Sequence, residues 1–406
     1  MHKNKNTQKA STENQIPDRI ITPVQYLELS DCEQKKWEPV KDKYEKVPPF
    51  CFVSLAITVA CIIIYIIACI SENFADFFNI YISSVFRWLL AQITNIFVFS
   101  IAEVIIILIP VILFISMWYF LKYRCKTKKA SLVSSLCILS VAAMLLSSFI
   151  LTFGTGYRGS SLDKKLEIER NKISAEELYL SAEYLIERIN ELSSEIYYGD
   201  DDFSQMPYSF DQMNENLLDA YEKFSKEHDF IKTYRSRLKP VALSEPMSYT
   251  HITGVYSFFT GEANINANFP DYTIPYTAAH ELAHQRGIAR EDEANMIAFL
   301  VCLQSDDKYI QYSAYLNMYE YISNALYKAD KELYYAAFEQ LSEDVYREEI
   351  AYSRFFKKYR DSSASAVSGA VNDVYLKAQG TEGKKSYGMV VDLTVAYFKS
   401  EKYIEN

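Results

Sequence analysis

TAAHELAHQRGIAREDEAN, residues 277–295, places two of the chain's five histidines four positions apart, with a glutamate directly after the first. Positions i and i+4 lie on one face of an α-helix, so His280 and His284 can hold one metal ion through their imidazole nitrogens. Glu281 is rotated by about 100° from His280, where its carboxylate approaches a metal-bound water instead of the metal. Gly287 is a natural end for this helix. The stretch therefore predicts a metal-binding helix, a turn and a second helix, although a helix could also carry these residues by chance.

The third protein ligand is expected among the acidic residues after the turn. In the pattern HExxHxxGxxH the third ligand is a histidine six residues after the second, but Arg290 occupies that position and cannot bind a metal. Glu291 lies on a helix face otherwise lined by alanines, which lets the second helix pack closely on the first, and it precedes Asn295 by one turn. We favour Glu291 over Glu293 as the third ligand of Zn²⁺, with Asn295 orienting its carboxylate. The acids not used as ligands would stabilise the helix N-terminus.

Composition excludes several classes of protein. The formal net charge of the 406 residues is -10, which argues against nucleic acid as a partner. Six of the seven cysteines lie at or before Cys137, and only Cys302 follows, so the C-terminal part cannot contain an internal disulfide. The long apolar runs lie almost entirely between Phe50 and Phe153, and the rest of the chain is charged and rich in tyrosine.

Three of these apolar runs are long enough to cross a lipid bilayer. They cover residues 50–70, 95–121 and 131–153, and a helix rises about 1.5 Å per residue. Residues 1–49, which are polar and contain five prolines, are predicted to form a disordered tail. Glu103 lies inside the second run. A carboxylate in lipid can mark a functional relay, but we favour a place for it near the outer interface or a bond to a neighbouring helix.

Basic residues predict the orientation of the spans. Five lysines lie between residues 35 and 46, and the loop KYRCKTKK (122–129) carries five lysines and arginines, whereas the connection 71–94 carries only Arg87. The positive-inside rule then places the N-terminus and the basic loop in the cytoplasm, and everything after Phe153 outside. The aromatic, amphipathic segment 72–93 is predicted to be a helix at the outer membrane interface.

The segment 239–269 interrupts a mainly helical pattern. KPVAL, GVYSFF and EANINANF are typical of two or three short strands, with Gly261 in the turn of a hairpin. Glu262, Asn264 and Asn266 share one face of the last strand by its period of two. These side chains would either line a substrate cleft or face solvent.

Two parts of the sequence resemble known families. ExxAN after HExxH, Glu291 to Asn295 here, looks like the second metal helix of the gluzincin peptidases, where it supplies a glutamate ligand; the seven-residue step from His284 to Glu291 is shorter than in typical gluzincins. The string from GVYSFF to EDEAN (254–295) resembles an uncharacterised family of bacterial membrane proteins with an extracytoplasmic HExxH domain. GYRGSSL after the third span and residues 371–393 are also similar to that family.

The apolar and periodic patterns predict a mainly α protein with three domains, and the resemblance implies that it is a membrane-anchored zinc peptidase-like protein. Residues 1–49 would be the cytoplasmic tail, 50–153 a three-helix transmembrane region, and 154–406 an extracytoplasmic zincin-like (α+β) domain with a small sheet before the metal helix. Within that domain, Tyr387 in the Gly-flanked segment KKSYG is a candidate to stabilise an oxyanion, although the chain has 33 tyrosines.

Together these features predict a membrane-anchored zinc metallopeptidase that hydrolyses peptides or proteins at the cell surface. Glu281 would act as general base and then as general acid. The alternative is a non-catalytic zinc-binding ectodomain that binds or senses a ligand. Glu281 favours the enzyme, because a structural zinc site needs no acid beside its first histidine and is usually closed by four protein ligands. Intramembrane proteolysis is disfavoured because residues 277–295 are too polar for a span.

Overall fold

The computed structural model describes residues 29–30, 34, 46–124 and 127–404, apart from the side chains of Tyr123, Arg124, Lys384 and Tyr387. The predicted disordered tail (1–49) therefore lies almost entirely outside the described residues. The chain divides into two compact units, one made of Met1–Val59 and Ile107–Leu145, the other of Ala60–Ile106 and Leu146–Asn406.

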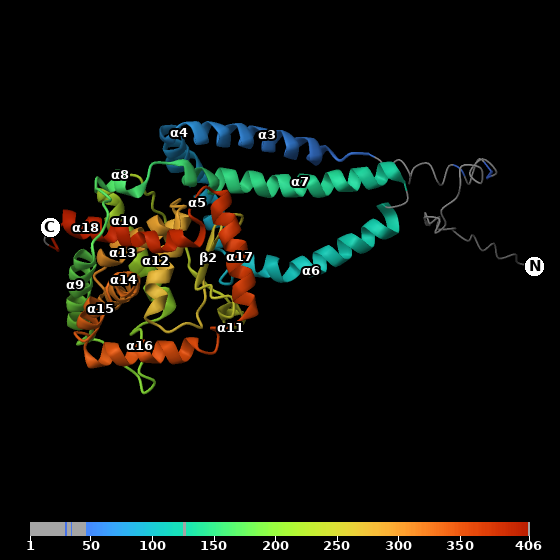
Figure 1. Cartoon of the computed structure of the whole chain (residues 1–406). Helices are drawn as coiled ribbons and strands as arrows, with labels where there is room; N and C mark the ends of the chain where they lie inside the picture. Colours follow the sequence, from blue (N-terminus) through green and yellow to red (C-terminus); the bar gives the residue numbers. More distant parts are fainter. Residues whose placement is uncertain (1–28, 31–33, 35–45, 125–126, 405–406) are drawn as a thin grey trace, which may run out of the picture. The chain divides into compact units, whose positions relative to one another are not determined.

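Within the described residues, three helices fit the predicted membrane spans in approximate place. The long apolar helices are α3 (Pro49–Ile70), α6 (Ile101–Tyr119) and α7 (Lys128–Thr152), and each is long and apolar enough to cross a membrane (Figure 1). A short π-helix, η2 (Phe120–Arg124), extends α6. The chain is therefore a membrane protein by the length and composition of its helices.

The predicted start of the second span was wrong by six residues, because α6 begins at Ile101 and not at residue 95. The helix begins there because its first backbone N–H groups have side-chain acceptors. The Glu262 carboxylate accepts hydrogen bonds from the N–H groups of Ile101 and Ala102, and Ser100 Oγ accepts one from Glu103 N–H. Glu103 in turn accepts hydrogen bonds from two backbone N–H groups, those of Ala242 and Leu243, so its carboxylate has a structural partner.

The larger unit is mainly helical, with one small sheet. Helices α9 (Ala175–Ser193), α10 (Phe210–Glu227), α12 (Thr273–Gln285), α13 (Glu291–Leu303), α14 (Lys308–Ala329) and α18 (Val390–Ser400) enclose one hydrophobic core. Shorter or more peripheral elements are η3 (Gly154–Arg158), α8 (Leu162–Leu166), α11 (Ser244–Ser248), α15 (Lys331–Phe338), α16 (Glu343–Phe356), α17 (Ser363–Ala378) and η4 (Gly383–Met389). In Figure 1, α12 and α13 lie near the middle of this unit, and α12 contacts α13, α14, β2 and β3.

The sheet has three short strands in the order β1-β3-β2. β2 (Gly254–Ser257) and β3 (Glu262–Ile265) form an antiparallel hairpin, and β1 (Lys239–Pro240) pairs with β3 in parallel. Gly261 adopts φ +72° in the connection, a conformation that favours glycine. The predicted hairpin with Gly261 in its turn is thus confirmed. β2 is left as an edge strand beside α12.

The segment 72–94 belongs to the same unit as the metal-binding stretch. It forms α4 (Glu72–Phe77), η1 (Phe78–Ser83) and α5 (Ser84–Thr94). Arg87 is only 1% exposed, and its guanidinium donates to the carbonyl oxygens of Asn79, Thr152 and Arg286. A domain boundary at Gly154 therefore omits residues that hold the end of α12 in place.

Candidate metal centre

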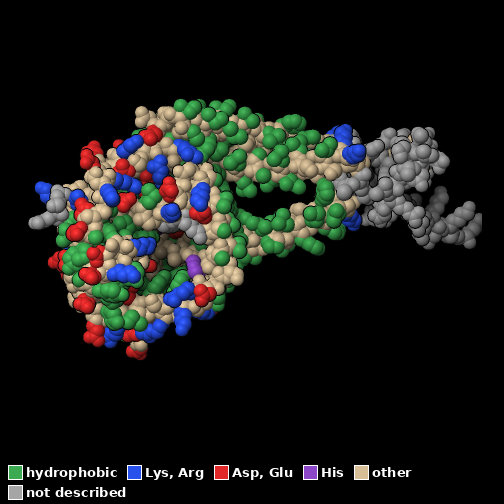
Figure 2. Space-filling view, in the orientation of Figure 1, with side chains coloured by type: hydrophobic (Ala, Val, Ile, Leu, Met, Phe, Trp, Pro, Cys, Tyr) green, Lys and Arg blue, Asp and Glu red, His purple; other side chains and the backbone are tan. Residues whose placement is uncertain are grey.

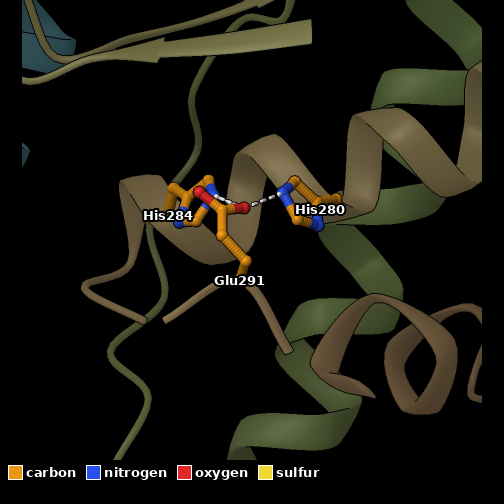
Figure 3. A group of neighbouring side chains, drawn as sticks. All are labelled: His280, His284 and Glu291. Atoms are coloured by element: carbon orange, nitrogen blue, oxygen red, sulfur yellow. Dashed lines mark ion pairs between the residues drawn. The ribbon is translucent and has the colours of Figure 1, made fainter. Parts of the chain in front are cut away.

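Two successive helices position three candidate ligands. His280 and His284 lie one turn apart on α12, which ends at Arg286, and Gly287 reverses the chain with φ +96°. Arg290 is extended, so α13 starts at Glu291, and the Glu291 side chain points back between the two imidazoles (Figure 3). The expected helix, turn and second helix are present in this stretch.

Small side chains let α12 and α13 approach closely. Ala279 and Ala283 on α12, and Ala294 and Ala298 on α13, are fully buried. A hydrogen bond from the Tyr276 hydroxyl to the carbonyl oxygen of Asn295, 3.1 Å long, also ties the two helices together. The ligand positions are therefore fixed by packing and not by a mobile loop.

The separations between the ligand atoms suit a tetrahedral metal ion. Glu291 Oε2 lies 3.3 Å from Nε2 of His280 and 3.3 Å from Nε2 of His284, and one ligand atom from each residue lies within 4.8 Å of the others. Zinc binds such atoms at about 2.0–2.1 Å, which places neighbouring tetrahedral ligands about 3.3–3.4 Å apart. A charge-assisted hydrogen bond between these atoms would be shorter, at about 2.7–2.9 Å.

The ring nitrogens of His284 have distinct partners. Nδ1 lies 2.7 Å from the carbonyl oxygen of Ile288, so an Nδ1–H donor leaves the Nε2 lone pair free to face Glu291. Burial alone lowers the pKa of His284, but the Glu291 carboxylate outweighs burial and raises the pKa to about 9. Burial raises the pKa of Glu291, yet the two histidines hold it well below its ordinary value. The site thus favours a bound cation, and a metal ion would take the place of the proton.

Glu281 lies beside the three ligands without ligating. Its side chain is 4% exposed, and Oε2 has no hydrogen-bond partner among the described atoms. Burial raises the pKa of Glu281, while the two neighbouring histidines and the backbone N–H of Tyr256 on β2 oppose that rise. A Cβ atom at Gly254 would lie 2.7 Å from Oε1 of Glu281, so only glycine lets β2 pass so close to this carboxylate.

The three ligands and Glu281 line a cavity of about 910 Å³. Its walls come from η3, β2, α12, α13, α14, α16 and α17, and include Tyr157, Gly254, Tyr276, Asn317 and Glu320. Figure 2 shows a hollow in the face of the larger unit that is turned toward the viewer, with a histidine side chain (purple) in it. The cavity is large enough for several residues of an extended peptide.

The structure places the three polar residues of β3 and its end away from this cavity, so the prediction that they line a cleft or face solvent was wrong. Glu262, Asn264 and Asn266 are each at most 1% exposed. Glu262 forms a buried ion pair of 2.7 Å with Lys239, besides accepting from the start of α6. Asn264 Nδ2 donates to carbonyl oxygens of the hairpin, and Asn266 Nδ2 donates to the carbonyl oxygen of Ile252. β3 is paired on both edges and also contacts α12 and α5, and all four of its residues are buried.

The remaining candidates have different places. Glu293, the competing ligand, accepts a hydrogen bond from Leu162 N–H and pairs with Arg290 at 2.7 Å, outside the ligand group. Asn295 lines the cavity, but its Nδ2 is buried without a hydrogen-bond partner, so the expected bond to the Glu291 carboxylate is not formed. Tyr387 lies in η4, and its side chain is outside the described residues.

Sequence reasoning missed Asn317 and Glu320, which line the cavity from α14. Their spacing of three places them on one helix face. The available signal was a polar pair within a tyrosine-rich helix, but helix periodicity does not show which face lines a cavity. Tyr157 on η3 was missed as well, and its hydroxyl lies 3.2 Å from that of Tyr375 on α17.

Comparisons with known proteins identify a family but assign it no activity. A family model described as "Protein of unknown function (DUF3810)" matches residues 74–395, from α4 to α18, and so covers every residue of the cavity. Nothing among curated proteins or solved structures matches the chain. The chemistry therefore has to be argued from the site itself.

Proposed function

Since the chain belongs to the DUF3810 family, whose description assigns no activity, we propose from the geometry of the site that it is a membrane-anchored zinc metallopeptidase with a zincin-like catalytic domain. The observation that carries the proposal is the pair of 3.3 Å separations between Glu291 and the two histidines, with Glu281 buried beside them in a large cavity. His280, His284 and Glu291 are three ligands, which leaves a fourth position open for a water molecule.

The reaction assigned to this site is hydrolysis of a peptide bond. Zinc, when bound, would lower the pKa of a water molecule and polarise the scissile carbonyl. Glu281 is held too far around α12 to ligate, so its free Oε2 would accept the proton of that water and then deliver it to the leaving amine. The walls of the cavity would exclude bulk water from the carboxylate and keep its basicity above that of an exposed glutamate.

The substrate would bind as an extended strand. β2 is an edge strand that lines the cavity, and edge strands can pair with a peptide through main-chain hydrogen bonds. Because β2 passes Glu281 at Gly254, a peptide added to this edge would carry its backbone past the metal and the base.

A non-catalytic zinc-binding ectodomain is the second candidate. It needs only the three ligands and the cavity beside them, and it requires no group to stabilise a transition state. Glu281 favours the enzyme, because a buried carboxylate oxygen without a partner destabilises the fold and contributes nothing to a structural zinc site.

The test uses the full chain purified in detergent, with Glu281→Gln as the variant and Glu222→Gln, an exposed residue of α10, as the control. We expect about one zinc ion per chain in all three proteins, and cleavage of a mixed peptide library that falls at least about 100-fold in Glu281→Gln only. Zinc without cleavage by the wild type would favour the sensing module. Cleavage unchanged in a zinc-loaded Glu281→Gln variant would refute the proposed mechanism.

A further inference from the structure

The cavity has an unbalanced charge. Among its described lining residues there is no lysine or arginine, and the acidic residues are Glu281, Glu291 and Glu320. The first two belong to the metal centre. Glu320 is therefore the charged group left to meet a substrate away from the metal.

Glu320 projects from α14 one turn after Asn317, and its side chain is exposed to the cavity. Among the described residues no hydrogen bond or ion pair engages its carboxylate. Glu348 on α16 offers a contrast, since that buried carboxylate accepts hydrogen bonds from Ser204 and Tyr312. The described residues thus donate hydrogen bonds to the carboxylate of Glu348 and none to the carboxylate of Glu320.

Aromatic rings and a further acid surround Glu320. Burial raises the pKa of Tyr276, Tyr321 and Tyr352, which all line the cavity, and the charge of Glu320 raises it further. Burial raises the pKa of Glu320 and, together with the charges of Glu320 and Glu348, raises that of Glu349 to about 8, so a bound cation would favour the ionised form of both carboxyl groups. A negative potential framed by tyrosine rings is the environment that a cation favours, through ion pairing and cation–π contact.

A second observation indicates that the cavity holds a ligand. Glu281 Oε2 and Asn295 Nδ2 are buried without a hydrogen-bond partner, and both residues line this cavity. Glu281 and Asn295 are 4% and 2% exposed. Unpaired polar groups so deeply buried are costly unless a bound molecule satisfies them.

We propose that Glu320, with Tyr321 and Tyr352, forms a subsite for a cationic group of the bound peptide, so that the cavity selects peptides with a lysine or arginine side chain or a free N-terminal amine. As a statement about substrates, the proposal rests on the proposed peptidase function. As a statement about binding, it can be tested without cleavage.

The experiment measures peptide binding to the full-length Glu281→Gln protein, in which cleavage is blocked. Fluorescent octapeptides carry either arginine or its neutral isostere citrulline at each position in turn, and each peptide is made with a free and with an acetylated N-terminus. We expect at least tenfold tighter binding of arginine than of citrulline at one position, or of the free over the acetylated terminus. Adding Glu320→Gln should abolish this preference, and adding Glu339→Gln, an exposed residue after α15, should preserve it.

The arginine–citrulline pairs test for a cationic side chain, and the free and acetylated peptides test for the N-terminal amine. The outcomes also distinguish the cationic subsite from the peptidase activity. A charge preference that depends on Glu320, without cleavage by the wild type, would retain the cationic subsite and refute the peptidase. Cleavage by the wild type without a charge preference, or with one that survives Glu320→Gln, would refute the subsite and retain the peptidase. Absence of peptide binding overturns the subsite. A thermal melt of each variant checks folding, and Glu320→Lys, which should prefer acidic peptides, gives an independent gain-of-function readout.

Discussion

At the residue scale, Glu291 and Glu293 show how two acids two positions apart on one helix acquire different tasks. Glu291 Oε2 lies 3.3 Å from both histidines, whereas Glu293 binds Leu162 N–H and Arg290. We predict that Glu291→Ala lowers zinc affinity at least about 100-fold, since it removes one of three protein ligands. Zinc content after dialysis against a graded chelator measures this effect.

The matched variant is Glu293→Ala, for which the opposite pattern is expected. Its carboxylate is 4% exposed, so removal leaves Leu162 N–H and Arg290 without their buried partner. We expect a loss of about 3 kcal/mol in the free energy of unfolding, with zinc affinity in the remaining folded protein close to that of the wild type. Equal loss of zinc in both variants would contradict the assignment of Glu291.

Sequence reasoning at this scale succeeded where periodicity decides geometry. The i, i+4 spacing brings His280 and His284 to one face, and the turn at Gly287 returns Glu291 to them. It failed where tertiary packing determines which side chains are buried and which line the cavity. The alternation of Glu262, Asn264 and Asn266 indicates a shared face but cannot show that other elements, α12 and α5 among them, pack on β3 and bury these side chains. Glu320 was missed because helix periodicity does not show which neighbour leaves a gap.

At the element scale, the relation between β2 and α12 depends on one glycine. Gly254 has no positive φ that would strain another residue, but a Cβ there would lie 2.7 Å from Cγ and Oε1 of Glu281. We predict that Gly254→Ala displaces either the strand or the carboxylate, and so lowers peptide cleavage by about 100-fold or more, because misplacement by about 1 Å has that cost. Zinc content should remain at the wild-type value, since the ligands lie on other elements.

Gly388→Ala in η4 is the matched control, because nothing lies within 4 Å of a Cβ added there. Cleavage and zinc content should both equal those of the wild type. Loss of zinc in Gly254→Ala would indicate that β2 supports the ligands and not the base. Unchanged cleavage in that variant would refute the role given to the close approach of the strand.

The elements differ in how well the sequence predicts them. Length and hydropathy identify α3, α6 and α7, because a bilayer imposes the same demand on every span. Length and hydropathy do not predict the start of α6, because the acceptors that begin the helix come from Ser100 and from Glu262, which lies far away in the sequence. The buried position of Arg87 could not be predicted for the same reason, because its partners are carbonyl oxygens of η1, α7 and the end of α12.

At the scale of the whole molecule, the number of spans and the distribution of basic residues predict on which side of the membrane the candidate metal centre lies. If all three candidate helices span the membrane, the segments before α3 and after α7 lie on opposite sides of it. The basic loop 122–129 favours the cytoplasmic side, so the metal centre would lie outside the cell. An outer position would suit the proposed binding of extended peptides, and the larger unit would need no disulfide there, because its hydrophobic core is continuous.

This orientation predicts a labelling pattern in intact cells that express the full chain. In a background without native cysteines, Glu339→Cys should react with a membrane-impermeant maleimide, because that residue is exposed and follows the third span. Thr127→Cys, before α7 in the basic loop, should react only after the cells are permeabilised. The positive-inside rule supplies the reason, as five basic residues in one short loop strongly disfavour its translocation. The reverse pattern would place the metal centre in the cytoplasm, and the peptide substrate would then have to be an intracellular one.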